Sequence, residues 1–404
     1  MDSTESGVSV CRMSYSVPEV RHSAGWTARR LLAGAMAMLV TALAAQITVA
    51  GKAPASVVPA TVDGVAAPPT PGAAYTAVGP CRLADTRQRS GITQVAPSIL
   101  RVVVAGRCGV PADASAAALT VTVTDTRALR HLTVFPTGET LPTASNVNWR
   151  AGETRANSVL ARLGSGGAID IYVSNRTAIV VDVSGAFVAA DAAGAGRFTP
   201  IEPARVLDTR RGAAVRARSV TRVARPAGVP GDAVALAVNI TATEAAGWGF
   251  FTAFPAGAPR PNTSVLNVDG PGQTRAASAI VPIAAAGLDI YAWSGAQLIV
   301  DVTGWFTGPS APLSPDGRFV ASSPSRVLDT RQGLGALAAS GAATIPPPAA
   351  AAALAATWTV VGASADDHWV SIRPAGSQPT ATSAINAAIG EEVANTAITP
   401  MSTA

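Results

Sequence analysis

Short apolar runs separated by glycine, proline and polar residues are the main pattern of this chain. They are rich in Val, Ile, Thr and aromatic residues, and Thr alternates with apolar side chains in residues 118–124. Period-two alternation in runs about ten residues apart, with no helical period, is typical of antiparallel strands. We therefore predict an all-β fold built of β-sandwiches; barrels would give a similar pattern.

In the first part of the fold the expected strands cover residues 99–104, 118–124, 131–135, 157–163, 168–173 and 177–183. Only Ser174, Asn175 and Arg176 separate the last two runs. A connection this short predicts that these two strands form a hairpin.

A six-residue phrase occurs three times, at 82–87, 205–210 and 326–331, and reads Arg-Val-Leu-Asp-Thr-Arg in the second and third copies. The spacings are 123 (205 − 82) and 121 (326 − 205) residues. Each repeat is long enough to be a domain with its own core. We predict modules at 79–190 and 199–308 and a partial module at 318–404. The third lacks the closing Asp-Val-x-Gly-x-Phe, so it is truncated, incompletely folded or completed by a partner strand.

The N-terminal residues 1–55 have the features of an export signal. Arg29-Arg30 precedes a long uncharged apolar run that ends among small residues. We expect a signal peptide or a membrane anchor here, and this segment is the only expected contact with a membrane. Residues 56–78, rich in Pro and Ala, are expected to form a linker. The modules are then extracellular or associated with the cell envelope.

Composition and charge exclude some functions. The chain has 404 residues, of which 14% are charged, and a net charge of +5. Its arginines are spread along the sequence, whereas nucleic-acid binding needs basic residues gathered on one face. We expect no nucleic-acid partner.

Two cysteines fall in the first module. Cys81 and Cys108 correspond to Ala204 and Ala227 in the second, so both are present or both absent. This favours a disulfide in an oxidising compartment over two unpaired thiols. No further soft ligands accompany them, and we expect no metal site.

The repeated phrase is the most conspicuous charged motif. In an extended segment, residues two apart share a face, so its Asp and second Arg can pair. The phrase can bind a sugar or an anion, or it can hold the start of each module in place. Its occurrence in all three modules favours the structural role. The residues concerned are Arg82, Asp85, Arg87, Arg205, Asp208, Arg210, Arg326, Asp329 and Arg331.

No catalytic motif is present, and we expect neither catalytic residues nor a cofactor. His131 and His368 occupy non-equivalent positions. A glycosidase-like pair, Asp170 with Asp182 or Asp289 with Asp301, is the alternative. Trp248 and Trp293 have no aromatic counterparts in the first module, which makes them candidates for exposed ligand contacts.

These features together resemble the tandem β-modules of secreted actinobacterial proteins. The shared elements are the repeated phrase, a Thr/Val strand, a Phe-Pro-x-Gly turn and the closing Asp-Val-x-Gly-x-Phe. The resemblance implies export and modularity and implies no reaction. We expect a non-enzymatic envelope protein whose partner is cell-wall polysaccharide or another envelope protein. The alternatives are a glycan hydrolase and an adhesin or assembly subunit completed by a partner strand.

Overall fold

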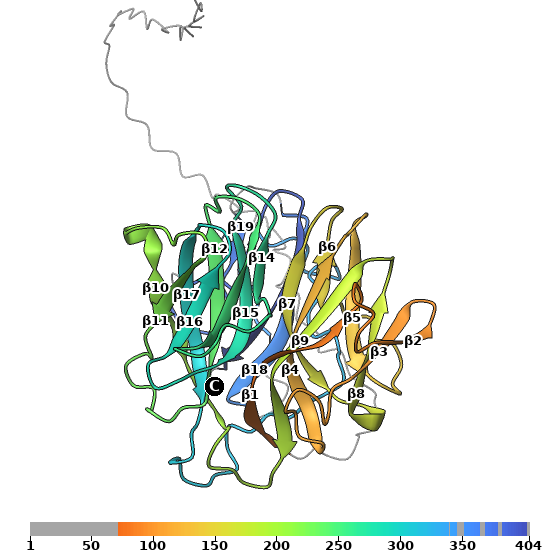
Figure 1. Cartoon of the computed structure of the whole chain (residues 1–404). Coiled ribbons are helices and arrows are strands. Elements are labelled where there is room, and N and C mark those ends of the chain that lie inside the picture. The colour runs from red at the N-terminus through yellow and green to blue at the C-terminus, as the bar shows by residue number, and fades with distance from the viewer. Residues whose placement is uncertain (1–71, 339, 346–350, 364–367, 379–381, 402–404) are drawn as a thin grey trace, which may run out of the picture. The chain divides into compact units, whose positions relative to one another are not determined.

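The computed structural model describes residues 72–338, 340–345, 351–363, 368–378 and 382–401. The expected signal or anchor, 1–55, lies outside the described residues. The all-β prediction is confirmed: apart from two short 3-10 turns, the regular elements described are strands in antiparallel sheets (Figure 1). No described helix is long and apolar enough to cross a bilayer.

Module 1 is a sandwich of an inner sheet, ordered β1-β9-β4-β7, and an outer sheet, ordered β2-β3-β8-β5-β6. Leu119 and Val121 of β4 meet Ile169 and Ile171 of β8 in a fully buried core between the sheets. The strands are β1 (Ala73–Asp85), β2 (Thr93–Ala96), β3 (Ile99–Val103), β4 (Ala114–Thr124), β5 (Arg130–Pro136), β6 (Val147–Trp149), β7 (Arg155–Arg162), β8 (Ala168–Val173) and β9 (Ala178–Ala189), with the turn η1 (Ser165–Gly167).

Module 2 repeats this plan, with the inner sheet β10-β17-β12-β15 and the outer sheet β11-β16-β13-β14. Its elements are β10 (Phe198–Asp208), η2 (Thr209–Arg211), β11 (Ser219–Val223), β12 (Ala235–Thr243), β13 (Gly249–Pro255), β14 (Leu266–Val268), β15 (Arg275–Pro282), β16 (Leu288–Ala292) and β17 (Gln297–Phe306).

Two expectations about module 1 are wrong. The strand β1 begins at Ala73, inside the expected linker, because Tyr75 is buried against Phe187 and Phe306. The runs at 168–173 and 177–183 do not form a hairpin. β8 pairs with β3 and β5, whereas β9 pairs with β1 and β4, so the short connection crosses from the outer to the inner sheet.

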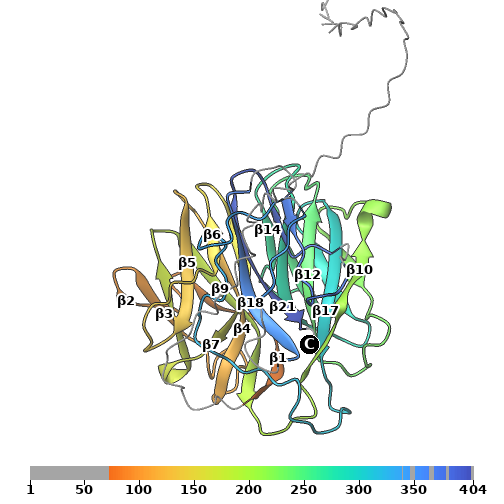
Figure 2. The same cartoon turned by 180° about the vertical axis from the view of Figure 1, so that it is seen from behind.

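Module 3 has four described strands in two pairs: β18 (Ala353–Val361) with β21 (Glu392–Pro400), and β19 (His368–Val370) with β20 (Ile385–Ala387). They correspond in order and register to β12, β15, β13 and β14 of module 2. Figure 2 shows β18 and β21 between the strands of modules 1 and 2. The third copy of the phrase, 326–331, is in no strand.

The three modules are joined in a closed ring by three equivalent backbone hydrogen bonds. Tyr75 N donates to Gly196 O at 2.8 Å, Phe198 N to Gly317 O at 2.6 Å, and Phe319 N to Ala73 O at 2.8 Å. Tyr75, Phe198 and Phe319 hold equivalent positions, each seven residues before the first arginine of its copy of the phrase. Module 1 thus bonds to the start of module 2, module 2 to that of module 3, and module 3 back to module 1.

Small and aromatic residues fill the space that the ring encloses. Phe187 and Phe306 contact each other at a centroid distance of 6.3 Å, and Phe319 lies 4.5 Å from Phe187. Ala116 and Ala118, on the face of β4 opposite Leu119, belong to this cluster and are buried. The inner sheet of module 1 is therefore buried on both faces.

Equivalent strands β7, β15 and β21 meet through buried asparagines. Asn157 Oδ1 of module 1 accepts from Thr396 N of module 3 at 3.0 Å, and Asn395 Oδ1 of module 3 accepts from Ser278 N of module 2 at 2.9 Å. The equivalent of these asparagines in module 2 is Ala277. The backbone amides of Thr396 and Ser278 on these edge strands are thus satisfied across module boundaries.

Beside these asparagines lies an ionic cluster. Arg155 contacts Glu153 at 3.1 Å and Glu391 of module 3 at 2.7 Å, while Arg275 of module 2 contacts Asp269 at 2.8 Å and Glu153 at 3.4 Å. Burial lowers the pKa of Arg275 to about 10, which leaves it protonated at neutral pH. The cluster therefore places opposite charges from all three modules in contact.

Replacing Asn395 by Ala should destabilise the whole ring. Its amide also donates to Ala384 O at 2.6 Å and to Asn239 Oδ1 at 3.0 Å, so the change leaves buried groups of modules 2 and 3 without partners. We expect a loss of about 2–3 kcal/mol in the free energy of unfolding, measured by urea denaturation. Asn175→Ala, in an exposed turn, is the control; equal effects of the two changes would contradict this role.

Candidate functional site

The charged residues of the repeated phrase are occupied by one another and by one strand of the same module. Arg87 donates to both carboxylate oxygens of Asp85, at 2.9 and 2.6 Å, and the Asp85 side chain is fully buried. Arg82 lies 3.5 Å from Asp85 and donates to Asp182 of β9 at 2.9 Å. The phrase therefore fastens β1 to β9.

Module 2 repeats this arrangement residue for residue. Arg210 binds Asp208 at 2.9 and 2.7 Å, and Arg205 binds Asp301 of β17 at 2.8 and 3.2 Å. Because the motif's guanidinium groups are engaged with carboxylates in both complete modules, we do not place the binding surface there.

Module 3 keeps only the local part of the motif. Arg331 and Arg326 both bind Asp329, at 2.7 and 2.8 Å, without a strand of the β9 or β17 kind beside them in the described residues. Arg326 instead donates to Thr143 O of module 1 at 2.8 Å. The pairing of residues two apart is thus encoded in the phrase itself.

The carboxylates that the motif's arginines bind have pKa values shifted in opposite directions. Hydrogen bonds from Arg210 hold the pKa of Asp208 at about 2, against the opposing effect of burial. Burial raises the pKa of Asp182 and of Asp301, and the hydrogen bonds from Arg82 and Arg205 offset this only in part.

The alternative acid pairs are not brought together. Asp170 lies on β8 in the outer sheet, and Asp182 lies on β9 in the inner sheet. Asp170 is bound by Arg101 at 2.7 and 2.9 Å, and Asp289 is bound by Arg222 in the same way. The expectation that they face each other across a hairpin is wrong, since that hairpin does not form.

Cys81 and Cys108 form the expected disulfide, with a Cα–Cα distance of 5.8 Å. It links β1 to the loop before β4 and encloses a loop of 27 residues, which is worth about 3 kcal/mol in the chain-entropy model. In the described residues, no group of three or more His, Cys, Asp or Glu side chains is arranged to hold a metal ion.

The two predicted tryptophans lie in bends beside β13 and β16 and form a row of four aromatic rings with Phe250 and Tyr291 of these outer-sheet strands. Trp248 lies 6.0 Å from Trp293, Trp293 lies 5.4 Å from Phe250, and Phe250 lies 6.2 Å from Tyr291, between ring centroids. Trp248 is 66% exposed and the others are half-buried. We call these four residues the aromatic strip.

Strand alternation explains why these rings face outward. On β13 Phe251 points into the core and is fully buried, so its neighbour Phe250 points to the other face. On β16 Ile290 is buried in the same way, and Tyr291 faces outward beside Phe250. Trp305 of β17, by contrast, packs against the core of module 2.

Two arginines from loops lie on the aromatic strip. The guanidinium carbon of Arg218 is 5.1 Å from the centroid of Trp293, and that of Arg260 is 4.1 Å from the centroid of Tyr291. Cation–π contacts of this kind contribute about 0.5–1 kcal/mol at exposed sites. These arginines and Tyr291 were not predicted, because loop conformation and cross-strand pairing bring them to the strip.

The strand register shows which parts of the strip are particular to module 2. Arg222 and Tyr291 correspond to Arg101 and Tyr172, and counting from them sets the other equivalences. Module 1 has Pro97, Leu129, Leu141 and Ser174 where module 2 has Arg218, Trp248, Arg260 and Trp293. Phe250 corresponds to His131, which lies 5.9 Å from Tyr172.

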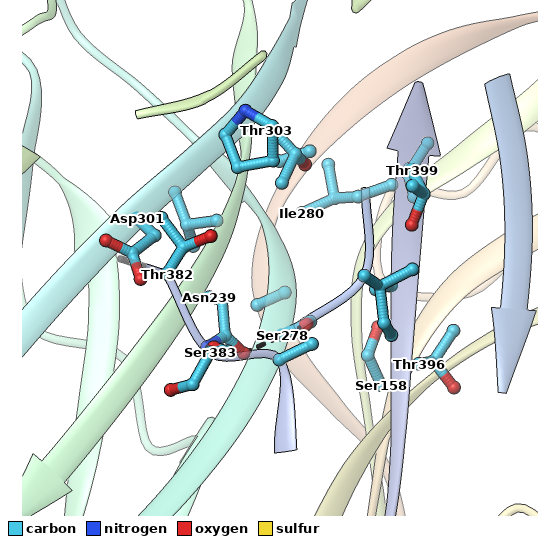
Figure 3. A pocket seen from close by; sticks show the side chains of 18 of the residues that line it. Ser158, Asn239, Ser278, Ile280, Asp301, Thr303, Thr382, Ser383, Thr396 and Thr399 are labelled. Atoms are coloured by element: carbon cyan, nitrogen blue, oxygen red, sulfur yellow. Dashed lines mark hydrogen bonds between the residues drawn. The ribbon is translucent and has the colours of Figure 1, made fainter. Parts of the chain in front are cut away.

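A small cavity lies where the three modules meet. Its lining includes Ser158 of module 1, Asn239 and Asp301 of module 2, and Thr382 and Thr396 of module 3 (Figure 3). Its volume of about 40 Å³ has room for a few water molecules and is too small for a sugar ring. The aromatic strip is therefore the stronger candidate site.

Comparisons with known proteins do not add a function. No family model and no curated protein matches the chain. Among solved structures, the chain is similar to one described as the STIV MCP, with 8% identity over 59% of this chain and 97% of that chain. The TM-score is 0.16, and no conclusion rests on this similarity.

Replacing Asp208 by Ala should lower the stability of module 2 without changing ligand binding. The change removes two charge-assisted hydrogen bonds that Asp208 accepts from Arg210, and it removes the carboxylate beside Arg205. The expected loss in the free energy of unfolding is about 1–3 kcal/mol. Thermal unfolding followed by circular dichroism measures the effect. Asp191→Ala, at an exposed loop position, is the control, and equal melting temperatures for Asp208→Ala and this control would contradict the fastening role.

The contribution of Asp208 should also disappear in acid. Its pKa is about 2 in the folded protein and about 3.9 in an unfolded chain, so its stabilisation is complete above pH 4. That stabilisation is lost as the pH falls through about 2. The stability difference between the wild type and Asp208→Asn should therefore shrink between pH 5 and pH 2 in urea titrations; a constant difference would contradict the assignment.

Proposed function

We propose that this is an exported, non-enzymatic envelope protein whose aromatic strip binds cell-wall glycan. The observation that carries the proposal is the row of Trp248, Trp293, Phe250 and Tyr291 on the outer sheet of module 2. Neighbouring aromatic rings offer apolar faces on which the C–H faces of sugar rings stack, and exposed aromatic patches of this kind mark binding surfaces.

The arrangement of the acidic residues supports binding without turnover. The acidic residues of the alternative pairs are each held by an arginine, and Asp170 and Asp182 belong to different sheets. A retaining or inverting glycosidase needs two carboxyl groups on either side of one glycosidic bond. The Cys81–Cys108 disulfide fits an oxidising compartment, as export requires.

Replacing Trp248 by Leu and Trp293 by Ser should abolish wall binding. These are the residues that module 1 has at equivalent positions, so the fold should tolerate them. We expect at least a tenfold loss of retention on purified cell walls in a pull-down assay. Trp369→Ala is the matched control, since it removes a tryptophan of module 3 that is 54% exposed. If cell walls retain the double variant as well as they retain the wild type, the proposal is contradicted.

A second candidate function is acceptance of a β-strand by module 3. β12 pairs with both β15 and β17, whereas its equivalent β18 pairs only with β21 among the described residues. The core-forming residues of β12 are buried, while most of β18 is half-buried. The edge of β18 that corresponds to the β17-paired edge of β12 has no partner strand among the described residues, and Arg326 corresponds to the Arg205 that binds Asp301 of β17. A strand of the Asp-Val-x-Gly-x-Phe type fits that place.

A synthetic peptide with the sequence of residues 297–306 should therefore bind the whole protein. Its Asp, equivalent to Asp301, is expected to pair with Arg326 as Asp301 pairs with Arg205. Fluorescence anisotropy should show one-to-one binding that weakens severalfold when this Asp is changed to Asn. In Arg326→Gln protein the two peptides should bind equally. No difference between the peptides on wild-type protein would contradict strand acceptance at this edge.

A further inference from the structure

We infer that the aromatic strip recognises an acidic polysaccharide, with Arg218 and Arg260 binding carboxylate groups of the sugar chain. The inference rests on the proposed glycan-binding function and specifies its ligand class. It starts from two guanidinium groups placed on the strip, 5.1 Å from Trp293 and 4.1 Å from Tyr291.

Neither guanidinium has a carboxylate partner. Within the described part of the chain, no Asp or Glu oxygen lies within 4.0 Å of Arg218 or Arg260, although many other arginines are paired. Stacking uses the flat face of a guanidinium and leaves its edge N–H donors directed to solvent. A planar carboxylate matches these donors in a bidentate manner. The strip thus offers stacking faces and unoccupied anion donors side by side.

The surrounding charge has the same sign. From Thr209 to Gly231 the chain carries six arginines and no Asp or Glu, and the loop from Ala256 to Val268 contains Arg260 and no acidic residue. Asp289, the acidic group on this face of the sheet, is already bound to Arg222. Arg218 and Arg260 therefore place two positive charges on the strip, which complement an anionic ligand.

The arginines and the tryptophans of the strip occur together in module 2. All four positions, Arg218, Trp248, Arg260 and Trp293, differ from their module 1 equivalents in charge or aromatic character. Arg218 moreover has a φ of 58°, a left-handed conformation that costs an arginine free energy and sets where its side chain begins. One module therefore combines stacking rings with cations that the other complete module lacks.

Acidic sugar chains fit this surface better than nucleic acid does. A groove for single-stranded nucleic acid tracks the backbone with positive charge along its length. The strip has two unpaired cations for four rings, which suits a polymer with sparser charges and apolar sugar faces. Carboxylates on a polysaccharide supply this combination.

The test compares one polymer backbone with and without charge. Polygalacturonate carries a carboxylate on each sugar, and its fully methyl-esterified form does not. We expect the wild type to bind polygalacturonate at least tenfold more tightly, and 0.5 M NaCl to remove this preference by screening. The Arg218→Gln/Arg260→Gln variant should lose about tenfold on polygalacturonate and change less than twofold on the ester. Affinity electrophoresis in gels containing each polymer measures both.

Controls separate this inference from the proposed function. Arg127→Gln/Arg176→Gln removes two exposed arginines of module 1 and should bind as the wild type does. Equal binding of both polymers by the wild type would overturn the preference for acidic sugars and leave glycan binding standing. Binding of neither polymer would overturn both. Tighter binding of poly-glutamate or of oligo-thymidylate than of polygalacturonate would overturn the assignment to a polysaccharide.

Discussion

The structure depends on the burial of one face of each inner sheet against the other modules. A sandwich ordinarily hides one face of a sheet and leaves the other to water. Here Ala116 and Ala118 are as buried as Leu119, because Phe187 and Phe306 cover them inside the ring. The amides of Tyr75, Phe198 and Phe319 close that ring. Removing any module would expose apolar surface and unpaired backbone groups on both of its neighbours.

Much of the fold follows from the local pattern of the sequence, and the two wrong expectations about module 1 have a common physical cause. Alternation in residues 118–124 predicted a strand, and the repeat predicted equivalent modules. The crossover from β8 to β9 was missed because a three-residue connection favours a hairpin unless both strands have better partners. The start of β1 at Ala73 was missed because its stabilising contacts, with Phe187, Phe306 and Phe319, are all made with residues far away in the sequence. Contacts between distant residues decided both cases.

The candidate site, too, could be predicted only in part from the sequence. Comparing repeats pointed to Trp248 and Trp293, since a residue present in one copy and absent from another is not needed by the shared fold. Tyr291 becomes part of the strip only through strand pairing, and Arg218 and Arg260 only through loop conformation. Neither can be read from spacing along the chain. The repeated phrase, the most conspicuous sequence feature, is instead engaged in fastening strands.

The ring has a consequence for how such a chain tolerates change. Its closing bonds and buried asparagines all belong to the inner sheets and the segments leading into them. The outer sheets contribute none of the three closing bonds. Substitutions at solvent-facing positions of an outer sheet, such as Trp248, therefore leave these bonds between the modules intact. The repeat thus leaves the outward face of one module free to change in sequence while bonds elsewhere keep the three modules together.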